Sequence, residues 1–546
     1  MTIQHKNIFL IISLLIFIIS CSSNNDHNRY NTIAEGGKVT ALITDPVETL
    51  DPAKIIFLTD WYSSLLVFEG LVGYGDNLEN VTPLIAERWE FSEGNTKIKF
   101  FIRKHIYFQD DACFKNGKGR EVTAEDVLYS FKRIADPAIQ CPNLYLFLGK
   151  IEGLEEYKNG NASTIKGIRI INDYTIEFTL TKPFVSFIKT LAVPAAYIIP
   201  KEAVDYYGDN FYKHPVGTGA FRLSLWEPTK KLVFTKNNSY WGKAGKERKP
   251  PYLDEVEFKI CKNISSQYAE LINSENGIIR VSKNRFQRLF KNKNFAKNFN
   301  TVSIGKGLGI RFWGFSMDNN SAFAKNKNLR RVIALSYNRN FLTEDSLNFN
   351  VLPENFMPDV FFPEGIKFKP VYNPELAKKI ISSYMNKKLK LNIGTNIISP
   401  DVISLRDGLI QIGIEPEINM MKSGYYNYII NERPDIFRVS MIPTYPDPQE
   451  YYSLCYSKSG RDINLMQFNN VQYDSLYDEL LVEREKRDEI INKLEEIIRT
   501  ELPVINVSHE NVNYFVFPVS IKGVRQNYIF PDFRFIYIDK HHEKGS

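Results

Sequence analysis

Hydrophobic residues recur along the chain with two different spacings, one typical of strands and the other of helices. In residues 97–104, Ile98, Phe100 and Ile102 share one face of an extended segment, which predicts a half-buried strand. Strands are predicted on similar grounds in residues 36–43, 232–242, 253–260, 388–395 and 504–517, and a hairpin turning at Asn172 and Asp173 is predicted in residues 168–183.

Helical spacing is clearest in residues 117–137. There Thr123 can act as the N-cap, Asp126 stands three residues later where an acidic side chain favours a helix start, and Pro137 ends the apolar stripe. Further helices are predicted in residues 60–72, 266–277 (closed by Gly277), 329–342, 373–384 and 474–503. The interleaving of strands and helices indicates an α/β or mixed α+β class.

Length and charge narrow the class of protein. A chain of 546 residues is too long for one core, so two or three domains are expected. Its 43% apolar and 24% charged residues are ordinary for a globular protein. The net charge of +6 is mild, and basic runs such as residues 291–300 are diluted by Asn, so no nucleic-acid partner is expected.

The N-terminus predicts export. Lys6 precedes an apolar run over residues 8–19, which is too short to span a bilayer and is typical of a signal peptide. The site at Ser20 and Cys21 resembles a bacterial lipobox, which implies a lipid on Cys21; an ordinary signal peptide is the alternative. We therefore expect a signal peptide at 1–20 and a flexible tether at 21–32. The protein would be anchored in the cell envelope, facing the periplasmic space or the outer surface, and the choice between the inner and the outer membrane stays open.

Four cysteines remain after Cys21, and their pairing is open. Cys113 and Cys141 could form a disulfide, while Cys261 and Cys455 complete the set, and buried free thiols are the alternative. None has the spacing of a zinc site.

Enzyme chemistry is not expected. The sequence has no G-x-S-x-G and no HExxH, and only His105, His214 and His509 lie in the predicted fold. His214 and His509 are the candidates for a metal carrier, and we expect neither a cofactor nor a resident metal.

Several segments together resemble the extracytoplasmic solute-binding proteins of ABC transporters, specifically the peptide/nickel-binding family that includes oligopeptide- and dipeptide-binding proteins. The segments that carry the resemblance are TLDPAK (49–54), VFEGLV (67–72), GREVTAEDVLYSFKRIADP (119–137), HPVGTGAFRL (214–223), KNNSYWG (236–242), LRRVIALSYNR (329–339) and YPDP (445–448).

This resemblance implies a two-lobed α/β fold of the periplasmic-binding-protein type (type II, large peptide-binding class), with an extra α+β domain in the first lobe. The first lobe would comprise residues 33–80, 185–275 and 505–546, the extra domain residues 81–184, and the second lobe residues 276–504. The implied function is capture of short peptides or related amino compounds in a cleft between the lobes. A monomer would deliver them to a membrane permease and its ATPase. A nickel-chelate or other small-solute carrier of the same fold is the alternative.

The resemblance also implies ligand contacts. In relatives, backbone groups after LDP extend a bound peptide, and the matching residues are Ile56, Phe57 and Leu58. MIPTYPDP (441–448) would form the facing wall and aim Tyr445 at the ligand. Met441 and Thr444 stand where relatives commonly have Trp and the Asp that clamps an α-amine, so either another acid supplies the charge or the ligand is not a plain peptide. Arg438 would meet a carboxyl end, and Asp447 is expected to form the turn.

Overall fold

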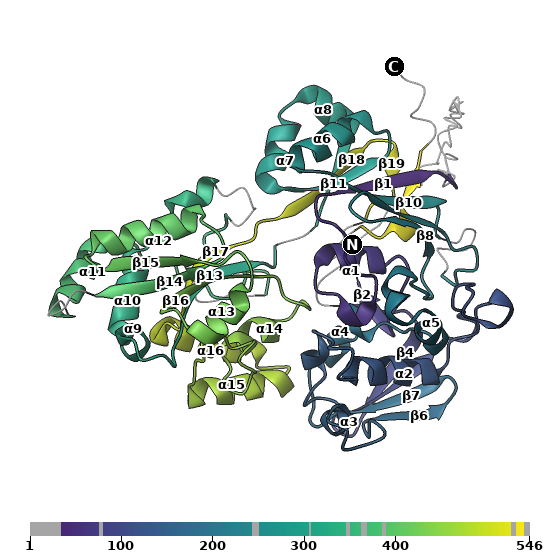
Figure 1. Ribbon diagram of the computed structural model, residues 1–546, viewed down its shortest axis with the longest axis horizontal. Coiled ribbons are helices and arrows are strands. Elements are labelled where there is room, and N and C mark those ends of the chain that lie inside the picture. The colour runs from purple at the N-terminus through teal and green to yellow at the C-terminus, as the bar shows by residue number, and fades with distance from the viewer. Residues whose placement is uncertain are drawn as a thin grey trace, which may run out of the picture.

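The computed structural model describes residues 34–75, 80–242, 250–304, 307–344, 350–361, 368–384, 389–525 and 531–539. The chain forms two bodies, which we call the first and second lobes (Figure 1). Cys21 and the predicted signal peptide and tether lie outside the described residues. No helix in the described part of the chain is long and apolar enough to cross a membrane.

A seven-stranded sheet forms the centre of the first lobe, with strand order β12-β18-β11-β1-β10-β9-β8. The N-terminal strand β1 pairs in parallel with both β10 and β11, so segments more than 200 residues apart lie side by side. Its strands are β1 (Lys38–Ile43), β8 (Phe221–Glu227), β9 (Lys231–Lys236), β10 (Glu255–Ile260), β11 (Gly277–Ser282), β12 (Phe299–Ser303) and β18 (Asn513–Pro518).

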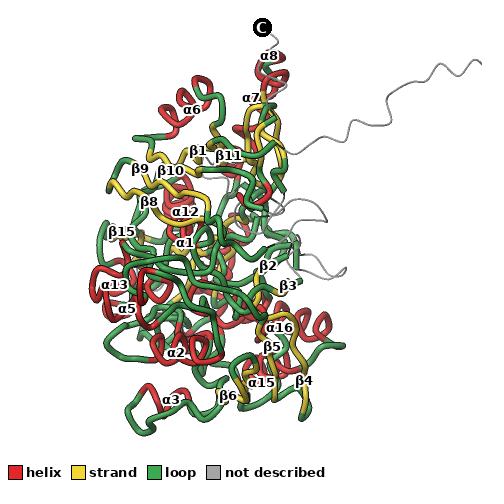
Figure 2. Tube along the Cα trace, turned by 90° about the vertical axis from the view of Figure 1, so that its right-hand side faces the viewer, coloured by secondary structure: helices red, strands yellow, loops and turns green. Residues whose placement is uncertain are grey.

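A four-stranded sheet, ordered β4-β5-β7-β6, lies at the other end of the same body (Figure 2). The predicted hairpin is present as β6 (Ile168–Asn172) and β7 (Thr175–Thr179), beside β4 (Ala86–Ser92) and β5 (Lys97–Ile102). Helix α2 (Ala124–Ala135) begins where predicted, and the Asp126 carboxylate accepts the N–H of Thr123 at 2.8 Å. The local sequence therefore specifies this helix start.

The other elements of the first lobe are short. Its helices are α1 (Leu58–Ser64), α3 (Leu154–Lys158), α4 (Phe187–Thr190), α5 (Lys201–Tyr207), α6 (Ile264–Asn273), α7 (Lys283–Phe290) and α8 (Lys293–Asn298). Two small ribbons join β2 (Val72–Tyr74) to β3 (Val81–Pro83) and β19 (Ile521–Lys522) to β20 (Tyr537–Ile538).

The second lobe has a five-stranded sheet with strand order β15-β14-β16-β13-β17. Trp313, Phe315 and Ile393 are fully buried in its core, where helices pack on the sheet. The strands are β13 (Ile310–Phe315), β14 (Lys390–Thr395), β15 (Glu415–Met420), β16 (Ile436–Met441) and β17 (Val504–His509). The helices are α9 (Ala322–Lys325), α10 (Lys327–Ser336), α11 (Pro374–Ile381), α12 (Pro400–Gln411), α13 (Tyr425–Glu432), α14 (Pro448–Tyr452), α15 (Val471–Val482) and α16 (Arg487–Glu501).

Several predicted elements differ in the structure, among them the helix predicted at 329–342, which ends at Ser336, and the strand predicted at 232–242, which ends at Lys236. The helix predicted at 60–72 ends at Ser64. The helix predicted at 474–503 is divided into α15 and α16. Between them the Glu483 carboxylate accepts the N–H groups of Arg484 and Glu485 at 2.8 and 2.9 Å, and these bonds compete with those of a continuous helix. Gly277 begins β11 instead of closing α6. The strand predicted at 504–517 is β17 and β18, which belong to different sheets.

The division of the chain into lobes by residue number stays a prediction, and the sheets give a reason to revise it. β11 and β12 lie in the first-lobe sheet, whereas β17 lies in the second-lobe sheet. We therefore expect the two crossings between lobes after β12 and after β17, later than residues 276 and 504 (Figure 1).

Candidate functional site

The candidate site is a cavity of about 920 Å³ lined by both lobes. Segments that are distant in the sequence line it together. The lining residues of the first lobe are Asp45, Pro46, Glu48, residues 55–59, Trp61, Pro142, Asn143, Tyr145 and Pro194. Those of the second lobe are Tyr426, residues 439–444, Glu450, Ser453, Leu454, Asp462, Ile463 and Leu465. Its volume lies within the range of pockets that hold small organic ligands.

The first-lobe wall is held rigidly from behind. The Asp51 carboxylate accepts the Ala53 N–H at 3.1 Å and is bound by both terminal nitrogens of Arg133 at 2.7 Å. Asn143 Nδ2 donates to the Ile55 carbonyl at 2.9 Å. This buried, bidentate pair fixes the turn that the TLDPAK segment forms, and with it the start of the wall.

The three residues predicted on this wall all line the cavity. Ile56 is 69% and Phe57 52% exposed, which is unusual for such large apolar side chains, and Leu58 follows them. The N–H and C=O of Ile56 have no hydrogen-bond partner among the described residues. An extended ligand could therefore pair with this backbone.

On the second-lobe wall, Met441 and Thr444 line the cavity. The Thr444 hydroxyl lies 2.9 Å from the Tyr145 hydroxyl of the first lobe, and the Thr444 N–H donates to Glu450 Oε2 at 3.1 Å. Thr444 thus joins the two walls through neutral groups.

The structure places Arg438 and Tyr445 outside the lining of the cavity, although the resemblance implied that both would contact a ligand. Arg438 Nε donates to Asp401 Oδ2 at 2.6 Å, and both side chains are buried, so the guanidinium already has its carboxylate. Tyr445 is 3% exposed, and its hydroxyl donates to Gln449 at 3.3 Å. Neither residue is among those that line the cavity.

Asp447 has a structural role, as expected for a turn residue. Its Oδ1 caps α14 through the Gln449 N–H at 3.1 Å. The same carboxylate pairs with Arg487 at 2.8 Å within the second lobe, and it accepts from Ser186 Oγ at 2.6 Å and Lys189 Nζ at 3.3 Å in the first lobe. Although burial is the largest opposing effect, the two cations lower the pKa of Asp447 below its ordinary value. The YPDP segment thus joins the two lobes.

Glu450 is a site residue that the sequence reasoning missed. It is 7% exposed and lines the cavity, and its Oε2 accepts from the Thr444 N–H and, at 3.4 Å, from the Tyr145 hydroxyl. Its Oε1 has no hydrogen-bond partner among the described residues. Burial raises the pKa of Glu450, and burial also lowers the pKa of Lys150, a cation that interacts with Glu450.

Nothing local in the sequence marks Glu450, or Tyr145 across from it. Each stands on an ordinary stretch, at the end of YPDPQE or within NLYLFL. Only the pairing of segments 305 residues apart brings the two side chains together.

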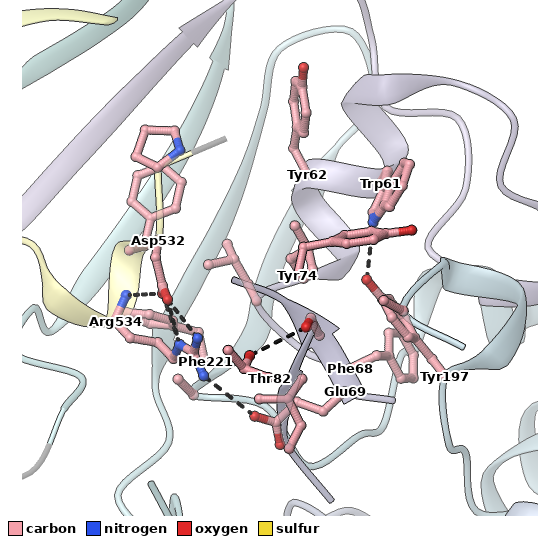
Figure 3. A pocket seen from close by; sticks show the side chains of 18 of the residues that line it. Trp61, Tyr62, Phe68, Glu69, Tyr74, Thr82, Tyr197, Phe221, Asp532 and Arg534 are labelled. Carbon is pink, nitrogen blue, oxygen red and sulfur yellow. Dashed lines mark hydrogen bonds and ion pairs between the residues drawn. The ribbon is translucent and has the colours of Figure 1, made fainter. Parts of the chain in front are cut away.

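A second, smaller cavity of about 90 Å³ lies in the first lobe beside Glu69 (Figure 3). Glu69 accepts from Thr218 Oγ1, Tyr240 OH and Trp241 Nε1 at 2.8, 2.8 and 2.7 Å, while Arg534 lies 3.9 Å away. Burial raises the pKa of Glu69, and Arg534 opposes the rise. This cavity is too small for a peptide.

Three family-like segments therefore meet at Glu69: VFEGLV, HPVGTGAF and SYWG. A side-chain carbon added at Gly217 or Gly219 would lie 2.2 Å from the Val67 carbonyl oxygen or 2.5 Å from that of Leu66. Glycine is required here because two backbone segments approach each other closely.

The histidine and cysteine candidates do not gather at the cleft. His214 stacks on Tyr207 with ring centroids 4.4 Å apart, and His509 is 3% exposed with Nε2 3.2 Å from the Phe356 carbonyl. Within the described residues, no group of three or more His, Cys, Asp or Glu side chains could hold a metal ion. Cys113, Cys141, Cys261 and Cys455 are free thiols in this structure.

Comparison with known proteins gives one family and many relatives. The family described as "Bacterial extracellular solute-binding proteins, family 5 Middle" matches residues 80–462. The chain is 24% identical to the periplasmic murein peptide-binding protein MppA of Escherichia coli over 90% of this chain and 91% of that one. It is also 24% identical to the dipeptide-binding protein DppE of Bacillus subtilis, over 92% and 93%.

Among solved structures, that of the periplasmic binding protein DppA from Helicobacter pylori in complex with the peptide STSA superposes with a TM-score of 0.74. The identity is 22%, with 93% of this chain and 99% of that one covered. This likeness establishes the fold.

Proposed function

Because this chain belongs to family 5 of the bacterial extracellular solute-binding proteins, a family of non-enzymatic binding proteins, we propose that it captures short peptides or related amino compounds in the cleft between its lobes and delivers them to an ABC permease. The observation that carries the proposal is the cavity of about 920 Å³ that both lobes line. A ligand that contacts both walls favours the closed arrangement, and a membrane partner can recognise that arrangement.

The contacts proposed for a peptide are backbone contacts on one wall and side-chain contacts on the other. The N–H and C=O of Ile56 offer a strand edge, with Phe57 and Leu58 beside it, and Met441 and Thr444 face them across the cavity. Main-chain pairing supplies affinity without reading the side chains of the ligand, which suits a carrier of varied peptides.

Three features of the relatives support this ligand class. MppA is named for murein peptide, DppE for dipeptide, and the DppA structure holds the peptide STSA. The same family association implies a permease and an ATPase as partners, since transport needs an energy source.

We further propose that Cys21 carries a lipid that anchors the protein in the cell envelope, and that the protein acts as a monomer. The support is the sequence Ile18-Ile19-Ser20-Cys21 after a short apolar run. Mass spectrometry of the N-terminal peptide from the native host should show an acylated Cys21; an unmodified Cys21 would contradict the anchor and leave the cleft proposal intact.

Calorimetry with defined peptides of two to five residues tests the ligand class. We expect micromolar binding, which corresponds to about −8 kcal/mol. Absence of binding to every peptide, together with binding of a non-peptide solute such as a nickel chelate, would refute the proposal.

Substitutions at Ile56 test the backbone contact. Ile56→Pro removes the N–H and should weaken peptide binding about tenfold, because one hydrogen bond contributes about 1 kcal/mol or somewhat more. Ile56→Ala keeps the backbone and should change affinity less than threefold. Val471→Pro is the matched control, because Val471 is the 82% exposed first residue of α15, where proline is tolerated.

A further inference from the structure

The polar lining of the cleft has one sign of charge. Four carboxylates line the cavity, those of Asp45, Glu48, Glu450 and Asp462, and no Lys, Arg or His is among the described residues that line it. A cavity whose low-dielectric walls carry one sign of charge concentrates ligands of the opposite sign.

Cations around the cleft are already bound within the protein, among them Arg311, whose Nε donates to the hydroxyl of the lining residue Ser440 at 3.2 Å. Arg438 is bound to Asp401, Lys189 and Arg487 are bound to Asp447, and Arg280 lies 3.2 Å from Glu510. Lys150 interacts electrostatically with Glu450, its Nζ donates to the Leu146 carbonyl at 2.8 Å, and it does not line the cavity. A ligand carboxylate would therefore enter the cleft without a cationic partner, and burying it unpaired is costly.

The acids, in contrast, are available. Asp45, Glu48 and Asp462 are exposed and make no ion pair with any other described residue. Glu450 is buried, and its Oε1 has no hydrogen-bond partner in the described part of the chain. Asp45 and Glu48 stand on the first lobe and Asp462 on the second, so a positive ligand between them would offset their mutual repulsion.

Most of the remaining lining is apolar. Besides Ile56 and Phe57, Tyr426 and Ile442 are 54% and 41% exposed at the cavity. Such exposure is relieved when an apolar ligand covers it.

We propose that the cleft selects apolar ligands with a net positive charge, held through their amino or other basic groups, and that it does not bind the carboxyl end of a peptide. Asp45, Glu48, Glu450 and Asp462 are the residues that determine this specificity. The inference rests on the proposed function, and it names the substrate class of the same cleft.

Three forms of one apolar tetrapeptide test it by calorimetry: free at both ends, amidated at the C-terminus, and acetylated at the N-terminus with a free carboxylate. The amidated form should bind at least as tightly as the free form, and the acetylated form at least tenfold more weakly. Raising the salt from about 50 to 500 mM should weaken the amidated form, because salt screens exposed charges. Tenfold weaker binding after amidation, or tightest binding of the acetylated form, would overturn the inference while leaving peptide capture standing. If none of the three forms binds, both are overturned.

Charge-neutral variants assign the effect to the named acids. The triple variant Asp45→Asn, Glu48→Gln, Asp462→Asn should weaken the amidated peptide about tenfold. It should leave the acetylated peptide unchanged or bound more tightly. The matched control Glu87→Gln, Glu155→Gln, Asp209→Asn changes the net charge equally at exposed acids outside the cavity, and it should change neither affinity. Equal losses in the two triple variants would mean that overall charge, not the cleft, attracts the ligand. Thermal melting verifies that each variant folds.

Glu450→Gln tests the buried acid separately. Glutamine keeps an oxygen that can accept the Thr444 N–H, so the local turn is preserved. Affinity for the amidated peptide should fall about tenfold or more, and an unchanged affinity would remove Glu450 from the proposal.

Discussion

Replacing Asp447 by Asn tests whether the YPDP segment joins the two lobes through charge. Asp447 is 3% exposed, and its carboxylate lies 2.8 Å from Arg487 and 3.3 Å from Lys189. Asparagine keeps one acceptor oxygen and removes the charge. Two partly buried cations then lose their common partner, one in each lobe.

The expected cost follows from burial. Removing one partner of a fully buried ion pair costs about 3–5 kcal/mol. The side chains of Lys189 and Arg487 are 21% and 17% exposed, so water screens part of the loss. We therefore expect the free energy of unfolding to fall by about 3 kcal/mol.

Denaturant titration at neutral pH measures that fall, and Ser186→Ala is the matched variant. It removes only the 2.6 Å hydrogen bond from the first lobe, which should cost about 1.5–3 kcal/mol because the acceptor is charged. Small-angle scattering should also show a larger radius of gyration for ligand-free Asp447→Asn, since the contacts it weakens cross between lobes. An unfolding free energy within 1 kcal/mol of the wild type would refute the reasoning.

Three further outcomes follow from named contacts. Arg438→Met should leave peptide affinity within twofold of the wild type. It should lower the free energy of unfolding by about 3–5 kcal/mol, because Asp401 stays buried without its cation. A large loss of affinity in calorimetry would show that Arg438 contacts the ligand after all. Gly217→Ala should destabilise the protein by more than 2 kcal/mol in denaturant titration, whereas Gly94→Ala, which meets no atom within 4 Å, isolates the cost of backbone strain alone. Burial lowers the pKa of His509 from 6.5 to about 4, so the contribution of neutral His509 to stability is complete above pH 6.5 and is lost as the pH falls towards 4. Relative to His509→Gln, the wild type should lose about 3 kcal/mol of unfolding free energy over that range. Parallel pH profiles of the two proteins would contradict this.

The local sequence was sufficient where one short segment satisfies its own chemistry. The start of α2 is an example, because Thr123 and Asp126 lie three residues apart and complete a cap without help from the rest of the chain. The hairpin at residues 172–173 and the turn role of Asp447 are predictable for the same reason. The family-like segments went further and indicated the fold and the presence of a cleft.

Tertiary structure decided which side chains face the ligand. The resemblance implied that Arg438 meets the carboxyl end of a ligand, yet in the fold it pairs with Asp401, 37 residues away. Glu450 carries no local mark and becomes a cleft acid only because Tyr145 and Thr444 meet beside it. Hydrogen bonds between near neighbours are encoded in a few residues, whereas burial and the sign of charge in a cavity are sums over segments that only the folded chain brings together.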